Sequence, residues 1–384
     1  MKILFIKEKR SPTGIEGIGN YLVSVCLALK KLNIDYLVLY NSEDKLFQKM
    51  SENNINVKLI DFPRNSPKIL FQFNKNKNFR KLIEKIVLDY EITHICIQWP
   101  YLLYFLSQKL GVPIIASWQG AFRINNRLPF FIWKEMFSPK KVIKTFYERF
   151  VGFNLDNANL VISPGIASKK TTNICFNTPN AKIIINPNGV IKPDLNEYRN
   201  LKLEFGFKIT DKVILSVGRI TKSKGAEDFC KVAELFKNRP EFKFIFLGPY
   251  RDKKYYDELL SKYGDIVKFT GLENNPNNFY KTADLFLFLS HREGGPLVLA
   301  EAMFFSLPLV GWDVIGVNEM IENNVNGSLC KFGDIRSVQE SVLKILDNNE
   351  TYINYSKMSL RQSSKYNIDS SVKRMVNIFK DVSV

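Results

Sequence analysis

The residues of this sequence that are most informative about its chemistry are two carboxylates eight positions apart, Glu293 and Glu301. Glu293 begins a Gly- and Pro-rich loop, Glu301 falls inside an apolar, helix-forming run, and a strand-like run over 284–290 precedes both. In an α/β sheet, the order strand, tight loop, helix directs the loop towards the crevice where ligands bind. The unpaired N–H groups that open such a helix favour anions. A carboxylate about two turns further in is suited to accepting hydrogen bonds from sugar or ribose hydroxyls.

A second candidate motif is the run 216–225, which follows a strand-like run and precedes a helix-like one. Gly218 permits a sharp exit from the strand, and Arg219 and Lys224 follow within the loop. Two fixed cations suit a diphosphate, since an arginine binds it as a bidentate fork and a lysine as a point charge. A solvated loop with charges flanking a helix is the alternative. The Glu293–Glu301 loop, at another strand end of the same expected sheet, favours the diphosphate site.

A glycine cluster at 14–20 joins the first strand-like run to the first helix-like run. Backbone N–H groups of such a turn can hold a phosphate. Gly17 and Gly19 do not form a dinucleotide fingerprint, because Leu22 stands where the third small residue is needed, and no P-loop lysine follows. Taken alone, such a cluster is more often a turn than a site.

Residue types that are scarce or missing also narrow the chemistry. The only histidines are His94 and His291, which excludes a multi-histidine metal site. No Gly-x-Ser-x-Gly elbow and no Asp-x-Asp metal pair occurs in the sequence. His94 lies in an apolar strand-like run and is expected in the core, whereas His291 fits the edge of a cleft or solvent equally well.

Strand-like and helix-like segments alternate along nearly the whole chain, which predicts parallel, doubly wound sheets. The pattern restarts after a polar stretch that follows 186–190. We therefore expect an α/β protein with two Rossmann-like domains facing a cleft, over residues 1–190 and 191–384, and a last helix that can pack back on the first domain. The expected strands are 1–6, 36–40, 57–60, 94–98, 112–117, 160–163, 213–217, 244–247, 267–270, 284–289 and 309–312, and the expected helices of the first domain are 20–31, 79–89, 102–109 and 143–153.

Length and composition fit a globular protein of two ordinary domains. The chain has 384 residues, and no apolar stretch approaches the roughly 20 residues that span a membrane. The charged cluster 7–10 follows the first strand-like run too soon for a signal peptide. Five scattered cysteines without a Cys-x-x-Cys pair fit reduced thiols, so the expected location is cytoplasmic.

The net charge of +17 is concentrated in the first half of the chain. Residues 1–190 carry 27 basic and 13 acidic side chains, whereas the remaining residues carry 28 and 25. Within the first half, 71–81 and 123–149 interleave aromatic and basic side chains, a mixture that suits the interface of an anionic bilayer. Binding of single-stranded nucleic acid, or core aromatics among solvated lysines, are the alternatives. The asymmetry itself indicates either an anionic surface met by the first half or a compositional bias.

The motifs together resemble a known family. Arg219 and Lys224, followed by Glu293-x7-Glu301, resemble the retaining nucleotide-sugar glycosyltransferases of the GT-B fold, of the family 4 type. The likeness covers essentially the whole second half, whereas in the first half it is limited to the Gly17 loop and the rhythm of strands. Further matching positions are 163–164, 187–190, Gly271 and 318–327.

This resemblance implies how a donor is held. Arg219 and Lys224 would bind the diphosphate, Glu301 would accept hydrogen bonds from the ribose, and Glu293 would face the donor sugar. The family is metal-independent and retains configuration by a same-face displacement in which the leaving phosphate takes the acceptor proton, so no metal or other cofactor is expected. The residues expected to act in catalysis are Arg219, Lys224 and Glu293, and those expected to bind the donor are Gly17, Gln119, Gly294, Gly295, Pro296, Leu297 and Glu301.

Three positions depart from the family pattern. Gln119 stands where many relatives have a histidine that contacts the donor sugar, and a glutamine can donate a hydrogen bond but carries no charge. Glu16 replaces the first of two common glycines, which puts a carboxylate close to the expected phosphate. The segment 304–306, Phe-Phe-Ser, replaces a smaller one, and the sequence alone gives no physical reason for it.

The sequence therefore predicts a glycosyltransferase that moves a sugar, with retention, from a nucleotide diphosphate to a saccharide acceptor. By analogy, the acceptor is lipid-linked and belongs to bacterial surface polysaccharide synthesis at the inner face of the cytoplasmic membrane. An anionic membrane surface is then a candidate partner, and nucleic acid is not expected. A soluble synthase of a small glycoside is the alternative within the fold. From other classes, a basic nucleic-acid-binding protein and an inactive nucleotide-sugar-binding subunit stay open.

Overall fold

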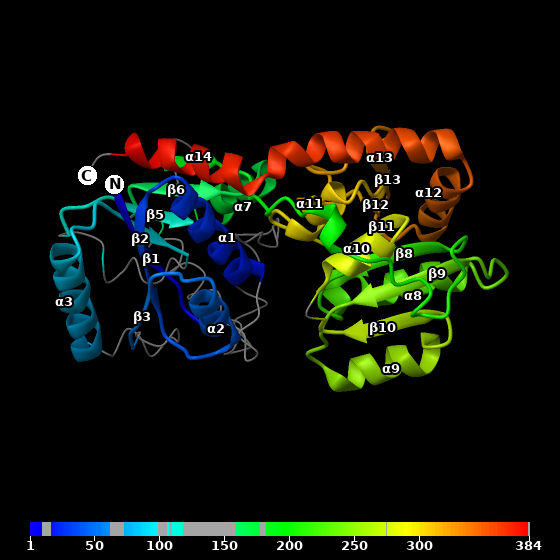
Figure 1. Cartoon of the computed structure of the whole chain (residues 1–384), viewed down its shortest axis with the longest axis horizontal. Helices are drawn as coiled ribbons and strands as arrows, with labels where there is room; N and C mark the ends of the chain where they lie inside the picture. The colour runs from blue at the N-terminus through cyan, green and yellow to red at the C-terminus, as the bar shows by residue number, and fades with distance from the viewer. Residues whose placement is uncertain are drawn as a thin grey trace, which may run out of the picture. The chain divides into compact units, whose positions relative to one another are not determined.

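The computed structural model describes residues 1–9, 17–61, 73–98, 110–117, 158–176, 182–273 and 275–382, together with residues 106 and 155. The chain forms two compact units. The first consists of Met1–Asn188 and Ile368–Val384, and the second of Gly189–Asn367. Each unit contains a parallel sheet with helices on both of its faces, which confirms the predicted α/β class (Figure 1).

The first unit is built on a sheet of seven parallel strands in the order β3-β2-β1-β4-β5-β6-β7. The chain runs from β1 outwards to β3 and then crosses to β4, so the strand order reverses between β1 and β4. The strands are β1 (Lys2–Ile6), β2 (Asp35–Tyr40), β3 (Val57–Leu59), β4 (His94–Ile97), β5 (Ile114–Ser117), β6 (Leu160–Ser163) and β7 (Ile183–Ile185). Only β7 has no counterpart among the strands expected from sequence.

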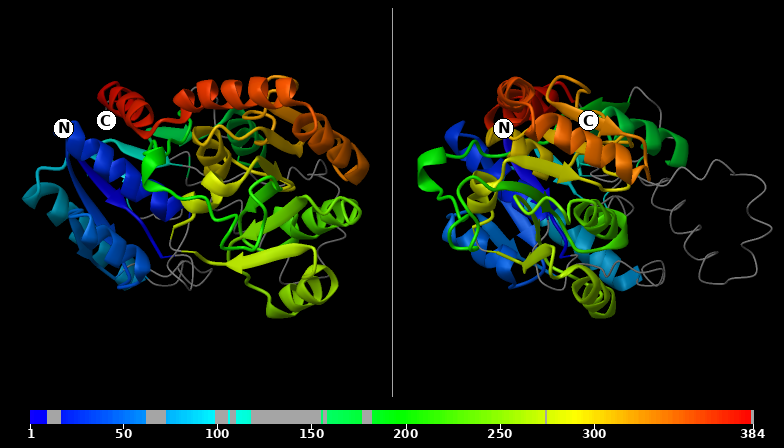
Figure 2. Two further views of the ribbon diagram at one scale, coloured as in Figure 1. Left: turned by 45° about the vertical axis from the view of Figure 1, so that its right-hand side comes forward. Right: turned by 90° about the vertical axis from the view of Figure 1, so that its right-hand side faces the viewer.

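Helices cover the first sheet in two layers. The α3 helix (Phe73–Asp89) buries Phe79, Ile83 and Ile86 in a core that includes alternate residues of β1 and β4. The α1 helix (Gly17–Lys31) and the last helix, α14 (Ile368–Lys380), lie side by side in Figures 1 and 2. The remaining described helices are α2 (Lys45–Glu52) and α7 (Ile166–Phe176), while the helices expected over 102–109 and 143–153 lie almost wholly outside the described residues.

Polar contacts hold α14 to the first unit. Ser371 donates from Oγ to Pro187 O at 2.7 Å, and Arg374 Nε donates to Asn186 Oδ1 at 3.1 Å. At the other end of the helix, His94 Nε2 donates to Phe379 O at 2.8 Å, and the two rings stack. His94 is therefore half-buried at the start of β4, and burial lowers the pKa of its imidazole.

The second unit is built on six parallel strands in the order β10-β9-β8-β11-β12-β13. The chain runs from β8 outwards to β10 and then crosses to β11, so the order reverses between β8 and β11. These two strands are direct neighbours, with Leu285 opposite Ile214. The strands are β8 (Lys212–Val217), β9 (Phe242–Leu247), β10 (Val267–Gly271), β11 (Leu285–Phe288), β12 (Leu309–Trp312) and β13 (Gly327–Cys330), of which β13 was not expected from sequence.

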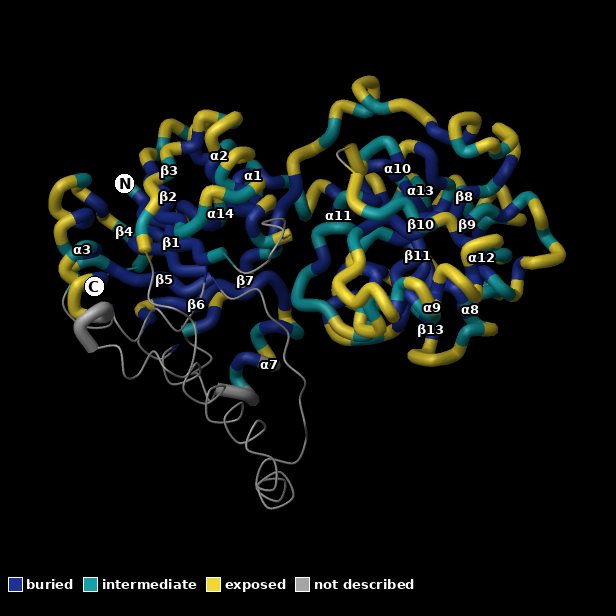
Figure 3. The backbone as a smooth tube through the Cα atoms, turned by 90° about the horizontal axis from the view of Figure 1, so that it is seen from below, coloured by how far each residue is buried: buried dark blue, intermediate teal, exposed yellow. Residues whose placement is uncertain are grey.

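The second sheet is also covered on both faces, and its strands are mostly buried except the edge strand β10, in which only Val267 is buried (Figure 3). One face packs on α8 (Ala226–Glu234), α9 (Lys253–Tyr263) and α12 (Ile335–Leu346). The other face packs on α10 (Asn277–Thr282) and α11 (Leu297–Phe304), and α13 (Asn349–Ser363) lies against α11 and α12. Among the helices that the structure describes in either unit, none combines the length and apolar character that crossing a bilayer requires.

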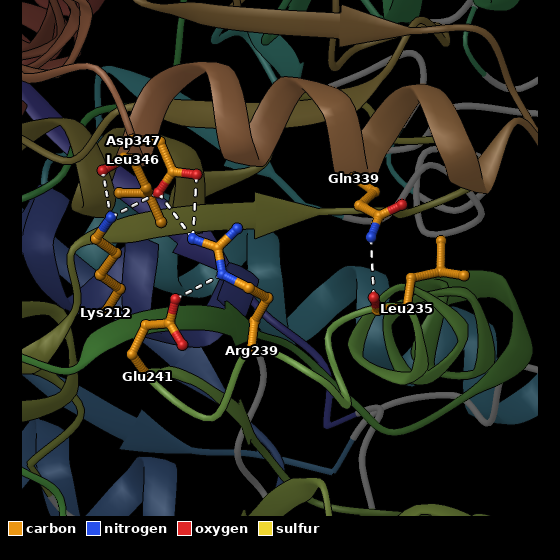
Figure 4. Close-up of polar contacts among 7 residues, drawn as sticks. All are labelled: Lys212, Leu235, Arg239, Glu241, Gln339, Leu346 and Asp347. Carbon is orange, nitrogen blue, oxygen red and sulfur yellow. Dashed lines mark hydrogen bonds and ion pairs between the residues drawn. The ribbon is translucent and has the colours of Figure 1, made fainter.

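A cluster of ion pairs lies at the amino end of β8 (Figure 4). We call it the amino-end cluster, and its members are Lys212, Arg239, Glu241 and Asp347. Lys212 Nζ donates to Leu346 O and to Asp347 Oδ1, both at 2.7 Å. Arg239 bonds both oxygens of Asp347 at 3.2 Å and Glu241 Oε1 at 2.6 Å. The cluster therefore ties the end of α12 to the start of β8 and to the turn before β9.

Candidate donor-binding site

The candidate site lies at the carboxyl ends of β8 and β11, where the strand order of the second sheet reverses. Such a switch point is the usual ligand site of an open α/β sheet, because the two loops leaving it diverge to opposite faces. The loop after β8 carries Arg219 and Lys224, and the loop after β11 carries Glu293. Two motifs some 70 residues apart in the sequence therefore come from neighbouring strands.

Glycine brings these two loops into close contact. Gly225 has a φ of +69° at the start of α8, and a Cβ there would lie 1.9 Å from Leu289 O. Only glycine fits this combination of a left-handed backbone and a neighbouring carbonyl. A hydrogen bond continues the contact, because His291 N donates to Ser223 O at 3.0 Å, and Ser290 Oγ also lies 3.3 Å from that oxygen. The loops after β8 and β11 are therefore packed and hydrogen-bonded to each other.

Side chains of both loops meet in what we name the carboxyl-end cluster, Lys224, Ser290 and Glu293. Lys224 Nζ donates to Glu293 Oε1 at 2.5 Å, and Ser290 Oγ donates to the same oxygen at 2.6 Å. The side chains of Lys224 and Glu293 are 24% and 12% exposed, whereas Ser290 is fully buried. An ammonium has three donors, so Lys224 can bind Glu293 and an anion together. Arg219, which precedes this cluster in the loop, is exposed.

The rest of the Glu293 loop leads into a helix. Gly294 and Gly295 are half-buried, Pro296 is buried, and α11 begins at Leu297. The Glu293 backbone is fixed as well, since its N–H donates to Ile315 O at 3.1 Å and Gly316 has a φ of +84° with a Cβ position 2.1 Å from Glu293 O. The first N–H groups of α11 therefore open beside the carboxyl-end cluster and add positive potential there.

Glu301, further along α11, has a partner that the sequence did not indicate. Tyr280, on α10, donates from its hydroxyl to Glu301 Oε2 at 2.6 Å. Glu301 is half-buried, and a carboxylate has about four lone-pair sites, so this bond leaves it able to accept others.

His291 is paired with an acidic residue at the edge of the site. Its Nε2 lies 3.0 Å from Asp228 Oδ2 in the first turn of α8, and its ring meets Phe332 edge-on. The side chain of His291 is 37% exposed, so it is neither fully buried nor fully solvated. Across the part of the chain that the structure describes, no three His, Cys, Asp or Glu side chains group closely enough to hold a metal ion.

In the first unit, the corresponding switch point lies at the carboxyl ends of β1 and β4. Lys7 and Gln98 directly follow these strands and are almost fully buried, and Gln98 Oε1 has no hydrogen-bond partner among the residues that the structure describes. Gly17 begins α1, with open space around the position of a Cβ. Gln119 and Glu16 lie outside the described residues.

Three residues around the second unit's site were not expected from the sequence: Ser290, Tyr280 and Asp228, which pairs with His291. Ser290 ends the strand-like run before Glu293 and could have been found by its spacing of three from that carboxylate. Tyr280 and Asp228 come from α10 and α8, and no local spacing connects them to Glu301 or His291.

Two Rossmann-like sheets, one with a lysine–carboxylate pair at its switch point, define a doubly wound α/β protein with a candidate ligand site at that point. Comparison with family profiles identifies the family. The profile described as "Glycosyl transferases group 1" matches residues 199–361, and that of "Glycosyltransferase Family 4" matches residues 15–191. Together they span most of the chain. The protein belongs to the GT-B glycosyltransferases of the family 4 type, which confirms the resemblance and makes it a glycosyltransferase.

Individual relatives agree with this assignment. The chain is 25% identical over 382 residues to an uncharacterized glycosyltransferase of Haemophilus influenzae, covering 97% of this chain and 98% of the relative. It is 21% identical over 380 residues, 95% and 96% of the two chains, to the N,N'-diacetylbacillosaminyl-diphospho-undecaprenol alpha-1,3-N-acetylgalactosaminyltransferase of Campylobacter jejuni. Among solved structures, Anabaena HepE in complex with UDP and glucose shares the fold, with a TM-score of 0.79, 17% identity and 99% of both chains covered.

Proposed function

We propose that this protein is a retaining, metal-independent glycosyltransferase that moves a sugar from a nucleoside diphosphate to a lipid-linked saccharide in the synthesis of a bacterial surface polysaccharide. The observation that carries the proposal is the carboxyl-end cluster, which holds a cation and a carboxylate together between two helix N-termini at the switch point of the second sheet. A site of this kind suits an anionic group bonded to a polyol, which describes a nucleotide sugar.

The proposal gives each expected residue a role in holding the donor. Arg219 and Lys224 are proposed to bind the diphosphate, with the first N–H groups of α11. Glu301 is proposed to accept hydrogen bonds from the ribose, and Glu293, with the backbone of 294–297, to contact the sugar. Glu293 is suited to this role because Lys224 and Ser290 fix its carboxylate. Gly17 and Gln119 are proposed to complete donor binding from the first unit.

The chemistry proposed for the site is a same-face displacement. The bond between the sugar's anomeric carbon and the diphosphate oxygen breaks with its electron pair leaving on the diphosphate. The acceptor oxygen bonds to the same face of that carbon, and its proton passes to the leaving phosphate oxygen. Lys224 and Arg219 would stabilise the charge that develops on the diphosphate, which is the part a metal ion plays in other enzymes. The protein then need not provide a nucleophile or a separate base.

Two observations support a lipid-linked acceptor: the name of one relative, and the positive charge of residues 1–190. The Campylobacter jejuni relative is described as acting on a diphospho-undecaprenol-linked sugar and matches nearly the whole chain. The basic surplus of residues 1–190 would favour an anionic bilayer that presents such a lipid.

A thermal-shift and calorimetric screen with UDP, GDP, ADP and their sugars tests the proposal. We expect one nucleotide to bind, with UDP first because HepE was solved with it, and we expect Glu301→Ala and Arg219→Ala each to remove most of the response. If neither variant weakens binding, the donor site is wrong. The identified donor is then offered with an acceptor lipid in anionic liposomes or with a water-soluble sugar, and transfer to the soluble sugar alone would contradict the lipid-linked acceptor.

A further inference from the structure

Tyr280 is a buried phenol that contacts one of the proposed donor-binding residues. Its side chain is 1% exposed, and its hydroxyl donates to Glu301 Oε2 at 2.6 Å. Tyr280 comes from α10 and Glu301 from α11, so the bond joins two helices on one face of the second sheet.

The hydroxyl can act only as a donor towards this carboxylate. Burial raises the pKa of Tyr280 well above its ordinary value, and the charge and hydrogen bond of Glu301 raise it further. The phenol therefore keeps its proton at every pH at which the protein works. A hydrogen bond to an ionised acceptor is also stronger than one between neutral groups.

Aromatic packing fixes the ring that carries this hydroxyl. The Tyr280 ring stacks on Phe305 at 5.6 Å with an angle of 18° and meets Phe286 at 5.7 Å. Phe305 directly follows α11 and also contacts Tyr198 at 5.8 Å. This packing is the structural reason for a large residue at 305, where the family pattern has a smaller one.

We propose that Tyr280 is a positioning residue that orients the Glu301 carboxylate towards the ribose hydroxyls and so sets the preference of the site for a ribonucleotide. A glutamate side chain has several rotatable bonds, and ordering it on binding costs affinity. A fixed phenol holding Oε2 removes that cost before the nucleotide arrives. The inference rests on the proposed donor contact of Glu301 and assigns a further residue to it.

The test compares Tyr280→Phe with the wild-type protein. Calorimetry measures binding of whichever of UDP, GDP and ADP binds best, and of its 2′,3′-dideoxy form, which lacks the hydroxyls that Glu301 would bind. Phenylalanine keeps the stack on Phe305 and Phe286 and removes only the hydrogen bond. We expect the Kd of the ribonucleotide to rise about tenfold, and that of the dideoxy form to rise less than about twofold. An equal loss for both nucleotides, or no loss for either, overturns the proposal.

Two further variants separate the possible failures. Phe305→Leu removes one of the two ring contacts but keeps the hydroxyl, and is expected to lower the melting temperature and to change the ratio of the two Kd values less than Tyr280→Phe does. Glu301→Ala is expected to bring this ratio close to one. If Glu301→Ala leaves the ratio unchanged, the ribose contact itself is wrong. If Glu301→Ala changes the ratio and Tyr280→Phe does not, the ribose contact stands and the role of Tyr280 is wrong.

Discussion

The second unit has a charged cluster at each end of the same strand, β8. The amino-end cluster and the carboxyl-end cluster each contain a lysine bonded to a carboxylate, at 2.7 Å and 2.5 Å. Their surroundings differ. In the amino-end cluster the side chains of Lys212 and Asp347 are 30% and 37% exposed, whereas in the carboxyl-end cluster Lys224 and Glu293 are 24% and 12% exposed and held by close backbone contacts. Charge pairing alone therefore does not mark a site.

The orientation of the helices explains the difference between the two ends. At the amino end, α12 finishes at Leu346, and Lys212 donates to its last carbonyl, so the cations offset the negative end of a helix. At the carboxyl end, α8 and α11 both begin, and their N-termini already add positive potential. A lysine placed there is favourable only with an anion, which Glu293 supplies within the chain and which we propose a diphosphate supplies during the reaction. The first arrangement stabilises the fold, whereas we propose that the second also binds the donor.

Lys224→Ala should have the largest effect on activity. Removing one preorganised donor from the developing charge is expected to lower kcat/KM about 100- to 1000-fold. Nucleotide release from the donor sugar, measured without an acceptor, would check this. Lys212→Ala is the matched control, because it removes a lysine from the amino end of the same strand and should leave kcat/KM within about twofold. Equal losses in the two variants would show that the ends do not differ in function.

The close contact of the two loops can be tested through Gly225→Ala. The added Cβ would meet Leu289 O and the left-handed backbone would be strained, so the second unit should lose roughly 3 kcal/mol of unfolding free energy. Gly206→Ala is the control, since Gly206 has a φ of +72° but open space around it, and it should cost about 1 kcal/mol from backbone strain alone. Urea unfolding followed by tryptophan fluorescence gives both values. If the two variants cost the same, the loops do not rely on their contact.

The sequence predicted most of the fold because hydrophobic runs and loops alternate with few interruptions. The strands it missed, β7 and β13, are three and four residues long and lie at the edges of their sheets, where short runs give little periodicity. Helix limits were less accurate, since α3 begins six residues before the expected position at 79. Its first turn, Phe73–Asn76, is polar apart from Phe73 and carries no apolar repeat.

The candidate site, too, could be predicted from the sequence only in part. The positions of Arg219, Lys224 and Glu293 in loops after β8 and β11 could be predicted, because the strand-like runs that precede these loops are visible in the sequence. The bonds among them could not, because they depend on β8 and β11 being neighbours, which only the strand order establishes. Tyr280 was beyond prediction for a related reason, since its ring is positioned by Phe286 and Phe305 on two other elements.

Asp347→Asn should have the smallest effect and sharpen the contrast between the ends. Asparagine keeps the shape but removes the charge that Lys212 and Arg239 share, so the unfolding free energy at pH 7 should fall by about 1 kcal/mol or less, given how exposed the cluster is. Asp257→Asn, on the more exposed pair with Lys253 in α9, is the control and should cost less than Asp347→Asn does. Donor turnover should be unchanged in both variants.

The same variant makes a prediction about pH. Burial opposes ionisation of Asp347, but hydrogen bonds from Lys212 and Arg239 outweigh it and hold the pKa below its ordinary value of 3.8. A carboxyl whose pKa is lowered by folding stabilises the protein above that ordinary value, and its contribution is lost as the pH falls through the folded pKa. The difference in unfolding free energy between the wild type and Asp347→Asn should therefore be constant from pH 5 to 8 and shrink below about pH 4. A difference that does not shrink at all as the pH falls below 4 would mean that the amino-end cluster stabilises through packing, and the contrast with Lys224 and Glu293 would then rest on shape rather than on charge.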